Sequence, residues 1–102
     1  MLKHIVFIKL NDSYSAENKQ EITRKIALKL NSLPQYITEI VKLETGINFN
    51  TRPSAFDLSL YVEFKNKDEL QSYQVHPKHK EVLTYLGSLK IETAVVDYEI
   101  TT

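Results

Sequence analysis

The chain has 102 residues, and its 13 lysine and arginine residues balance its 13 aspartate and glutamate residues. This length predicts one domain over residues 1–102 with a real hydrophobic core, and the scattered, balanced charge argues against a nucleic-acid-binding protein. The sequence contains no cysteine, which excludes disulfides, thiolate catalysis and zinc–thiolate sites and is compatible with a reducing cytosol.

Residues 2–10 are rich in β-branched and aromatic side chains and predict a first strand. Lys3 and Lys9 interrupt its apolar run, which is too short for a signal-peptide core or a membrane span. We therefore expect a cytoplasmic protein with no membrane partner. Both faces of this strand carry large apolar side chains: Leu2, His4, Val6, Ile8 and Leu10 share one face, and Lys3, Ile5, Phe7 and Lys9 share the other.

The next segment predicts a helix that begins after Ser15 as its N-cap and runs to about Leu33, where Pro34 ends it. Its charged residues lie on an outer, solvated face. The inner stripe follows the helical period and consists of Ile22, Ile26, Leu30 and Leu33.

Residues 38–48 predict a second strand, with a possible bulge at Gly46, and a polar loop follows over residues 48–54. Residues 56–65 form the clearest strand, because apolar and polar side chains alternate along it. Its apolar face consists of Phe56, Leu58, Leu60, Val62 and Phe64.

Residues 66–87 contain two of the three histidines. A short helical turn is predicted to end near Tyr73, and a new helix to begin at Pro77, because proline fits the first helical position. Gly87 is expected to end this helix in a left-handed conformation. His79 falls on one helical face with Val82, Leu83 and Leu86, so its ring is expected to point inward and to stay neutral near the positive end of the helix dipole.

Two interpretations of His79 with Tyr73 follow from this placement. One is a proton acceptor beside a positioning hydroxyl group, and the other is a hydrogen-bonded pair that anchors the helix in the core. His76 is expected to cap or precede the helix at Pro77, and His4 to be a satisfied core histidine. No close pair of histidines with a carboxylate suggests zinc, and we predict neither a metal site nor a cofactor.

Residues 89–100 predict the last strand and complete the order β-α-β-β-α-β of a ferredoxin-like α+β fold. Four strands then form an antiparallel sheet with the helices on one face, above the even-numbered side chains of the first and third strands. The opposite face mixes Ile5, Phe7 and Tyr61 with charged residues and is too apolar to remain wholly in water. We therefore expect a homodimer that packs sheet on sheet.

Several segments, in this order, resemble the stress-responsive A/B barrel domain, known as Dabb, of the dimeric α+β barrel group. The opening Lys3-His4-Ile5-Val6-Phe7 is one of them, and Tyr73-x-Val75-His76-Pro77-x-His79 is the most specific. The others are Glu44-Thr-Gly46-x-Asn48, Arg52-Pro53-x-Ala55-x-Asp57-Leu58 and Val96-Asp97-Tyr98. The resemblance covers essentially the whole chain and implies a ferredoxin-like monomer whose sheet packs on that of its twin.

The resemblance also implies function. Most of this family has no assigned activity, whereas a plant branch similar to olivetolic acid cyclase closes linear polyketides without a cofactor. By motif position, Tyr73 and His79 would carry that acid–base chemistry, although Leu58 replaces a histidine of that branch and isoleucines replace larger aromatic residues in the first helix. We expect a homodimer that binds a small apolar ligand between sheet and helices, or alternatively a polyketide-cyclase-like lyase. The expected ligand-contacting residues are His4, Val6, Ile8, Ile22, Ile26, Leu58, Leu60 and His76.

Overall fold

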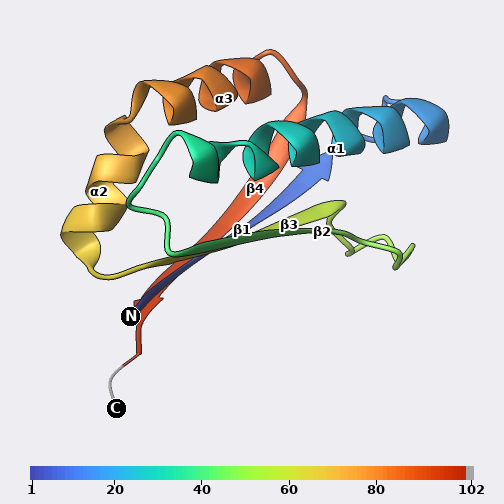
Figure 1. The fold of residues 1–102 in the computed structure, drawn as a ribbon. Helices are drawn as coiled ribbons and strands as arrows, with labels where there is room; N and C mark the ends of the chain where they lie inside the picture. The colour runs from blue at the N-terminus through green and yellow to red at the C-terminus, as the bar shows by residue number, and fades with distance from the viewer. Residues whose placement is uncertain (101–102) are drawn as a thin grey trace.

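The computed structural model describes residues 1–100 as a four-stranded sheet with three helices over one face (Figure 1). The elements are β1 (Leu2–Leu10), α1 (Ala16–Asn31), a 3-10 turn (Leu33–Gln35), β2 (Lys42–Ile47), β3 (Leu58–Phe64), α2 (Lys67–Val75), α3 (Pro77–Gly87) and β4 (Ile91–Glu99). The predicted ferredoxin-like order is confirmed, with α2 and α3 together as its second helical segment. The last two residues of the predicted domain, 101 and 102, lie outside the described part.

The sheet has the strand order β2-β3-β1-β4, and every neighbouring pair is antiparallel. β1 therefore lies in the interior of the sheet, between β3 and β4, while β2 and β4 form its two edges. In this register His4 stands opposite Val62 on β3 and opposite Asp97 on β4. A residue near the start of the chain and one near its end are thereby held side by side.

The hydrophobic core lies between the sheet and the helices, as the alternation of apolar residues predicted. Most of its members come from the even positions of β1 and β3 and from the inner face of α1 and the turn after it. The strand residues are Leu2, Ile8, Leu10, Leu58, Leu60, Val62 and Phe64, and the helical segment adds Ile26, Leu30 and Leu33. Each of these ten side chains is at most 4% exposed, so packing is close to complete at these positions.

Helix α1 begins as predicted, because the Ser15 hydroxyl group accepts a hydrogen bond from the Asn18 backbone N–H at 3.1 Å. It ends at Asn31, two residues before the predicted end. Pro34 has no N–H to continue the α-helical pattern, and the chain tightens into the 3-10 turn that contains it.

Two predictions about the middle strands are wrong. Gly46 makes no bulge, because it pairs directly with Ser59 in an unbroken register between β2 and β3. Phe56 precedes β3 and does not lie beneath the helices; its ring packs on Phe7, with 6.2 Å between ring centroids, on the opposite face of the sheet. The alternation of inward and outward side chains does not extend to Phe56, because the pairing of β3 with its neighbours begins only at Leu58.

Two predictions about α3 are also wrong. Gly87 is the last helical residue and does not adopt a left-handed conformation. The Ser88 N–H bonds to the Tyr85 and Leu86 carbonyl oxygens and closes the helix in a right-handed turn, so no positive φ is needed. Leu83 is 49% exposed, because the inward face of α3 runs through Val82, Tyr85 and Leu86.

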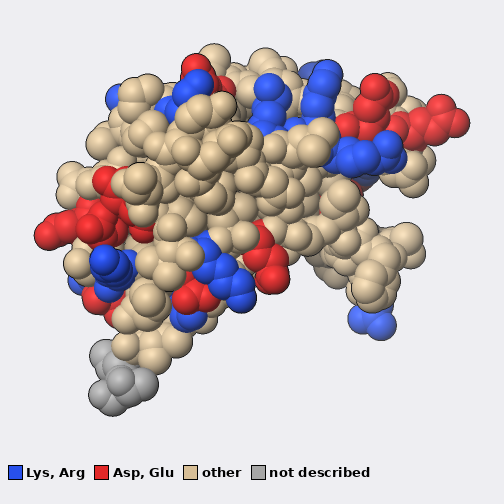
Figure 2. All heavy atoms as spheres, in the orientation of Figure 1, with Lys and Arg blue, Asp and Glu red and all other residues tan. Residues whose placement is uncertain are grey.

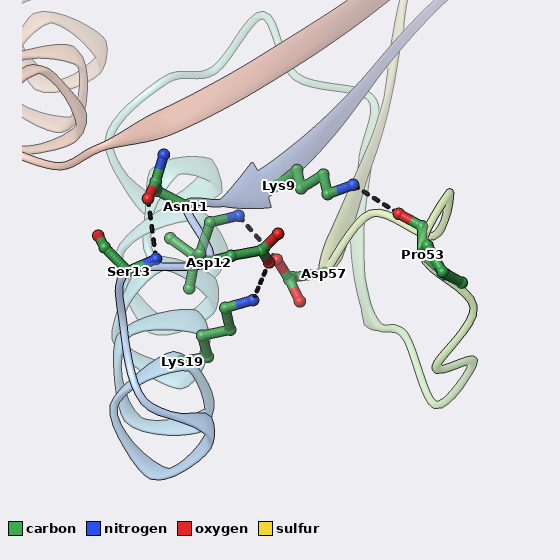
Figure 3. A network of polar contacts seen from close by, with 8 residues as sticks. Lys9, Asn11, Asp12, Ser13, Lys19, Pro53 and Asp57 are labelled. Atoms are coloured by element: carbon green, nitrogen blue, oxygen red, sulfur yellow. Dashed lines mark hydrogen bonds and ion pairs between the residues drawn. The ribbon is translucent and has the colours of Figure 1, made fainter.

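A polar network fastens the end of β1 to its neighbours (Figure 3). The Asp57 carboxylate accepts a hydrogen bond from the Leu10 backbone N–H at 2.7 Å, and the Lys9 ammonium group donates to the Pro53 carbonyl oxygen at 2.7 Å. Lys19 pairs with Asp12 at 2.8 Å and ties the loop after β1 to α1. Within residues 1–100, no helix is long and apolar enough to cross a bilayer.

Candidate functional site

Four rings from four different elements meet beneath α2 and α3. Tyr73 of α2 lies at the centre, with ring centroids 4.3 Å from His79 of α3, 5.0 Å from Phe64 of β3 and 6.0 Å from His4 of β1. The fold thus brings His4 and His79 to opposite ends of one aromatic cluster. The helix break at His76 and Pro77 makes this possible, because it lets α3 turn back over the ring that α2 presents.

Tyr73 is completely buried, and its hydroxyl group has no hydrogen-bond partner within residues 1–100. Burial raises the pKa of Tyr73 above that of an ordinary tyrosine. The phenol therefore stays protonated at neutral pH and is a hydrogen-bond donor without an acceptor. A buried unpaired hydroxyl group costs free energy and calls for a specific explanation.

His79 is partly buried, and its Nδ1 atom lies 3.2 Å from the Gln74 backbone carbonyl oxygen. Because a carbonyl oxygen only accepts, Nδ1 carries the proton and Nε2 is left as the acceptor. Burial lowers the pKa of His79; the Gln74 carbonyl oxygen opposes this shift, and the charges of His4 and His76 add to it. The imidazole is therefore held neutral. Its contact with Tyr73 is between rings, and the hydrogen bond of the core-pair interpretation is not formed.

His4 is 7% exposed, and its Nδ1 atom is paired with the Asp97 carboxylate across the β1–β4 ladder. A carboxylate beside Nδ1 holds a proton on that atom and fixes the orientation of the ring. Asp97 is a site residue that the sequence reasoning did not assign. Asp97 stood in one of the segments that carry the family resemblance, but its pairing with His4 becomes readable only once β1 and β4 are known to be neighbours.

His76 has a local role. It is the N-cap of α3, and its Nδ1 atom accepts a hydrogen bond from the Lys78 backbone N–H at 3.1 Å. This placement agrees with the predicted position before the Pro77 helix. No three histidine, aspartate or glutamate side chains of the described residues converge in a way that could hold a metal ion.

The apolar residues expected to contact a ligand divide into two groups. Ile8, Ile26, Leu58 and Leu60 are at most 4% exposed and belong to the close-packed core. Val6 and Ile22 are partly buried and pack against that core from its margin. The first four present almost no surface to a ligand.

A hollow of about 530 Å³ opens between α2 and β4. It is lined by Leu2, Lys67, Leu70, Gln74, Asp97, Tyr98 and Glu99. Two of these residues bond directly to the aromatic cluster, since Asp97 holds the His4 ring and the Gln74 carbonyl oxygen holds the His79 ring. Lys67 and Glu99 also form an ion pair from α2 to β4, with 3.6 Å between nitrogen and oxygen. Each of the two histidines is therefore bonded to a residue that lines the hollow: His4 to Asp97, and His79 to Gln74.

Comparison with known proteins gives a consistent picture. A dimeric protein of unknown function with a ferredoxin-like fold from Bacteroides fragilis is 35% identical, with a TM-score of 0.88 over 97% of this chain and 95% of that one. The Arabidopsis thaliana protein At3g17210 is 25% identical, with a TM-score of 0.72 over 100% of this chain and 97% of that one.

A curated relative, the stress-response A/B barrel domain-containing protein DABB1 of Arabidopsis thaliana, is 25% identical over 107 residues. That alignment covers 96% of this chain, which spans about half (46%) of the length of the relative. The family described as Stress Responsive A/B Barrel Domain (Dabb) matches residues 2–100. A match over nearly the whole chain is decisive, and the chain belongs to the stress responsive A/B barrel domain family.

Proposed function

We propose that the chain is a self-associating Dabb domain that binds a small, largely apolar molecule carrying a carbonyl or hydroxyl oxygen. The ligand enters from the hollow between α2 and β4 and places its oxygen atom beside Tyr73. His4 and His79 flank that position. The volume of the hollow, about 530 Å³, lies in the range typical of small-molecule sites.

The unpartnered Tyr73 hydroxyl group is the observation that carries this proposal. A core that served stability alone would place phenylalanine there, because the same ring would pack without an unpaired donor. A carbonyl or hydroxyl oxygen of a ligand supplies the acceptor that the protein does not. The His79 tautomer that the Gln74 carbonyl oxygen fixes leaves Nε2 as an acceptor for a polar hydrogen of the same ligand.

Self-association is supported by the uncovered face of the sheet. Phe7 is 43%, Val96 55% and Tyr98 45% exposed there, next to the Lys3–Glu63 ion pair at 3.1 Å. We call this surface the open sheet face; it consists of the odd positions of β1 and β3 and the even positions of β4. It combines apolar side chains with a paired charge, as protein–protein interfaces do. The 35% identical relative from Bacteroides fragilis is described as dimeric.

Acetophenone tests the ligand site, because it joins an apolar ring to one carbonyl acceptor. We expect its titration into the ¹⁵N-labelled protein to shift the amide signals around Tyr73, His79 and Asp97. Tyr73→Phe should weaken binding about tenfold, the equivalent of one hydrogen bond in a buried site. Equal binding by the wild type and by Tyr73→Phe would contradict the proposal.

Sedimentation tests self-association. The wild type should sediment as twice the 11.8 kDa chain, and Val96→Asp should sediment as a single chain, because it places a charge among the apolar side chains of the open sheet face, beside Ile5. Leu28→Asp is a matched control, since Leu28 is 68% exposed on α1 and should leave the assembly unchanged.

A second candidate function is a cofactor-independent lyase that closes rings, as in the plant branch of the family. The protonation states of the two central groups favour it: Tyr73 is held as a phenol and His79 as a neutral base. In this reaction His79 Nε2 would remove a proton from the carbon next to a carbonyl group, while Tyr73 donates a hydrogen bond to the enolate oxygen that forms. The enolate carbon would then form a carbon–carbon bond to a second carbonyl carbon of the same substrate molecule, and the oxygen of that carbonyl group would take back the proton from His79 Nε2.

The first half of that reaction can be measured alone. In deuterium oxide, the proposed base should speed the exchange of the acetophenone methyl protons, followed by NMR. His79→Gln should abolish the acceleration while it preserves binding. If the wild type binds acetophenone without accelerating exchange, the binding function stands and the lyase function does not.

A further inference from the structure

Phe49 is the most exposed large apolar side chain of the described residues, at 97% exposure. It lies in the loop between β2 and β3, next to Ile47, which is 57% exposed. In Figure 1 this loop extends past the ends of β2 and β3, and in Figure 2 it forms a mostly uncharged projection at the lower right. We call residues 48–54 the arm. Together Phe49 and Ile47 make an exposed apolar patch at this projection, and contiguous apolar patches mark contact surfaces.

The arm has a defined conformation. Its asparagine side chains fold it locally, since Asn48 Oδ1 accepts from the Asn50 N–H and Asn50 Oδ1 accepts from the Arg52 N–H, both at 2.9 Å. The Asn48 amide group also donates to the Phe56 carbonyl oxygen at 2.7 Å. At the other end, Lys9 holds the Pro53 carbonyl oxygen (Figure 3). A loop bonded in this way presents Phe49 at little further cost in conformational entropy.

The base of the arm is continuous with the open sheet face. A hollow of about 390 Å³ lies where they meet, and Phe7, Ile47, Phe49 and Phe56 are among its lining residues. Phe7 belongs to the open sheet face and Phe49 to the arm. One chain therefore carries both an apolar projection and an apolar receiving surface, which is what a twofold symmetric interface requires.

We propose that the arm clasps a second copy of the chain and that Phe49 packs on the open sheet face of that copy along its β4 edge. This inference rests on the self-association proposed above, and it assigns to the arm the role of stabilising the dimer. The arm leaves the sheet at the end of β2, and β2 and β4 are the two edges of the sheet. A twofold axis parallel to the strands sets β2 of one copy beside β4 of the other, with like ends together.

The charges of the arm and of β4 are complementary, which supports a second copy of the chain as the partner. Arg52 is the one charged residue of the arm. At the start of β4, Glu92 lies on the open sheet face, opposite Lys9 in the register, and forms no ion pair within residues 1–100. The Lys9 ammonium group is already engaged by the Pro53 carbonyl oxygen. Arg52 of one copy therefore meets an unpaired carboxylate on the other.

The absence of tryptophan from the chain permits a direct test. Phe49→Trp introduces a single tryptophan at the arm, and its fluorescence reports whether the ring is in water. At high protein concentration the emission should lie at short wavelength, and it should move to long wavelength on dilution, in parallel with dissociation measured by sedimentation. Leu28→Trp is the control, and its emission should stay at long wavelength throughout, because Leu28 is 68% exposed on α1.

A truncating variant measures the energy of the contact. Phe49→Ser should raise the dissociation constant of the dimer at least about tenfold, whereas Leu28→Ser should change it less than about twofold. Since both side chains are exposed in the single chain, neither change should impair folding.

The possible failures are distinguishable. In one outcome, Phe49→Trp forms a dimer whose tryptophan emits at long wavelength at every concentration, while Phe49→Ser leaves the dimer intact. This result would refute the contact between the arm and the second copy, and self-association would stand. A wild type that remains a single chain at every concentration would refute self-association, and the arm with it.

Discussion

Tyr73 and His79 touch through their rings, at 4.3 Å between centroids, and not through a hydrogen bond. The Tyr73 hydroxyl group is left without an acceptor, and the His79 Nδ1 atom is turned to the Gln74 carbonyl oxygen instead. A pair that only anchored α3 would be expected to satisfy the hydroxyl group. The arrangement keeps a donor and an acceptor nitrogen available in one place.

Tyr73→Phe should stabilise the protein. Removal of a buried, unpaired hydroxyl group should increase the free energy of unfolding by about 1 kcal/mol, measured by urea denaturation. Tyr14→Phe is the matched control with the opposite sign, since the Tyr14 hydroxyl group accepts a hydrogen bond from the Lys90 N–H at 3.1 Å. A loss of stability in Tyr73→Phe as large as in Tyr14→Phe would mean that the Tyr73 hydroxyl group is satisfied in solution.

Protein stability should fall as the pH drops below the ordinary histidine value of 6.5, because burial lowers the pKa of His79 in the folded state. Below that pH the unfolded chain takes up a proton before the folded chain does, so the stabilising contribution is complete above 6.5 and is lost towards the folded pKa. Urea denaturation at several pH values measures the slope. His79→Gln should reduce it, and His76→Asn, which keeps a residue suited to the N-cap, should retain it.

The His4–Asp97 pair should show a coupling energy. Asp97→Asn should cost about 1 kcal/mol in the wild type, because the pair is partly buried, and nearly nothing in a His4→Gln background. Thermal and urea denaturation of the four proteins of this cycle measure the difference. Glu99→Gln is a control, since its partner Lys67 is largely exposed and such pairs contribute little. Equal costs of Asp97→Asn in both backgrounds would rule out the coupling.

Leu58→His tests whether position 58 borders the ligand site. Leu58 is 2% exposed, so a histidine there should lower the free energy of unfolding by about 3 kcal/mol. Leu58→Met should cost less than about 1.5 kcal/mol, because it keeps volume and polarity. Wild-type stability combined with tighter acetophenone binding in Leu58→His would instead place position 58 in the site.

Local pattern was enough to predict most of the fold. The content of β-branched and aromatic residues marked β1, alternation marked β3, helical spacing marked the inner face of α1, and Pro77 marked the break between α2 and α3. These signals are local because backbone periodicity decides which side chains share a face. Where pairing begins and ends is not local, and for that reason Phe56 and Gly46 were misplaced: their positions depend on the neighbouring strand.

The sequence alone determined which functional groups are present: histidine and tyrosine around a helix break, and no cysteine. It also determined that the sheet carries apolar side chains on both faces. Only the tertiary structure decided how these groups are engaged. Asp97 lies 93 residues from His4 and reaches it only through the β1–β4 register, and the Tyr73 hydroxyl group lacks a partner only because the surrounding core is apolar. Hydrogen-bond partners far apart along the chain are fixed by packing, which no local pattern encodes.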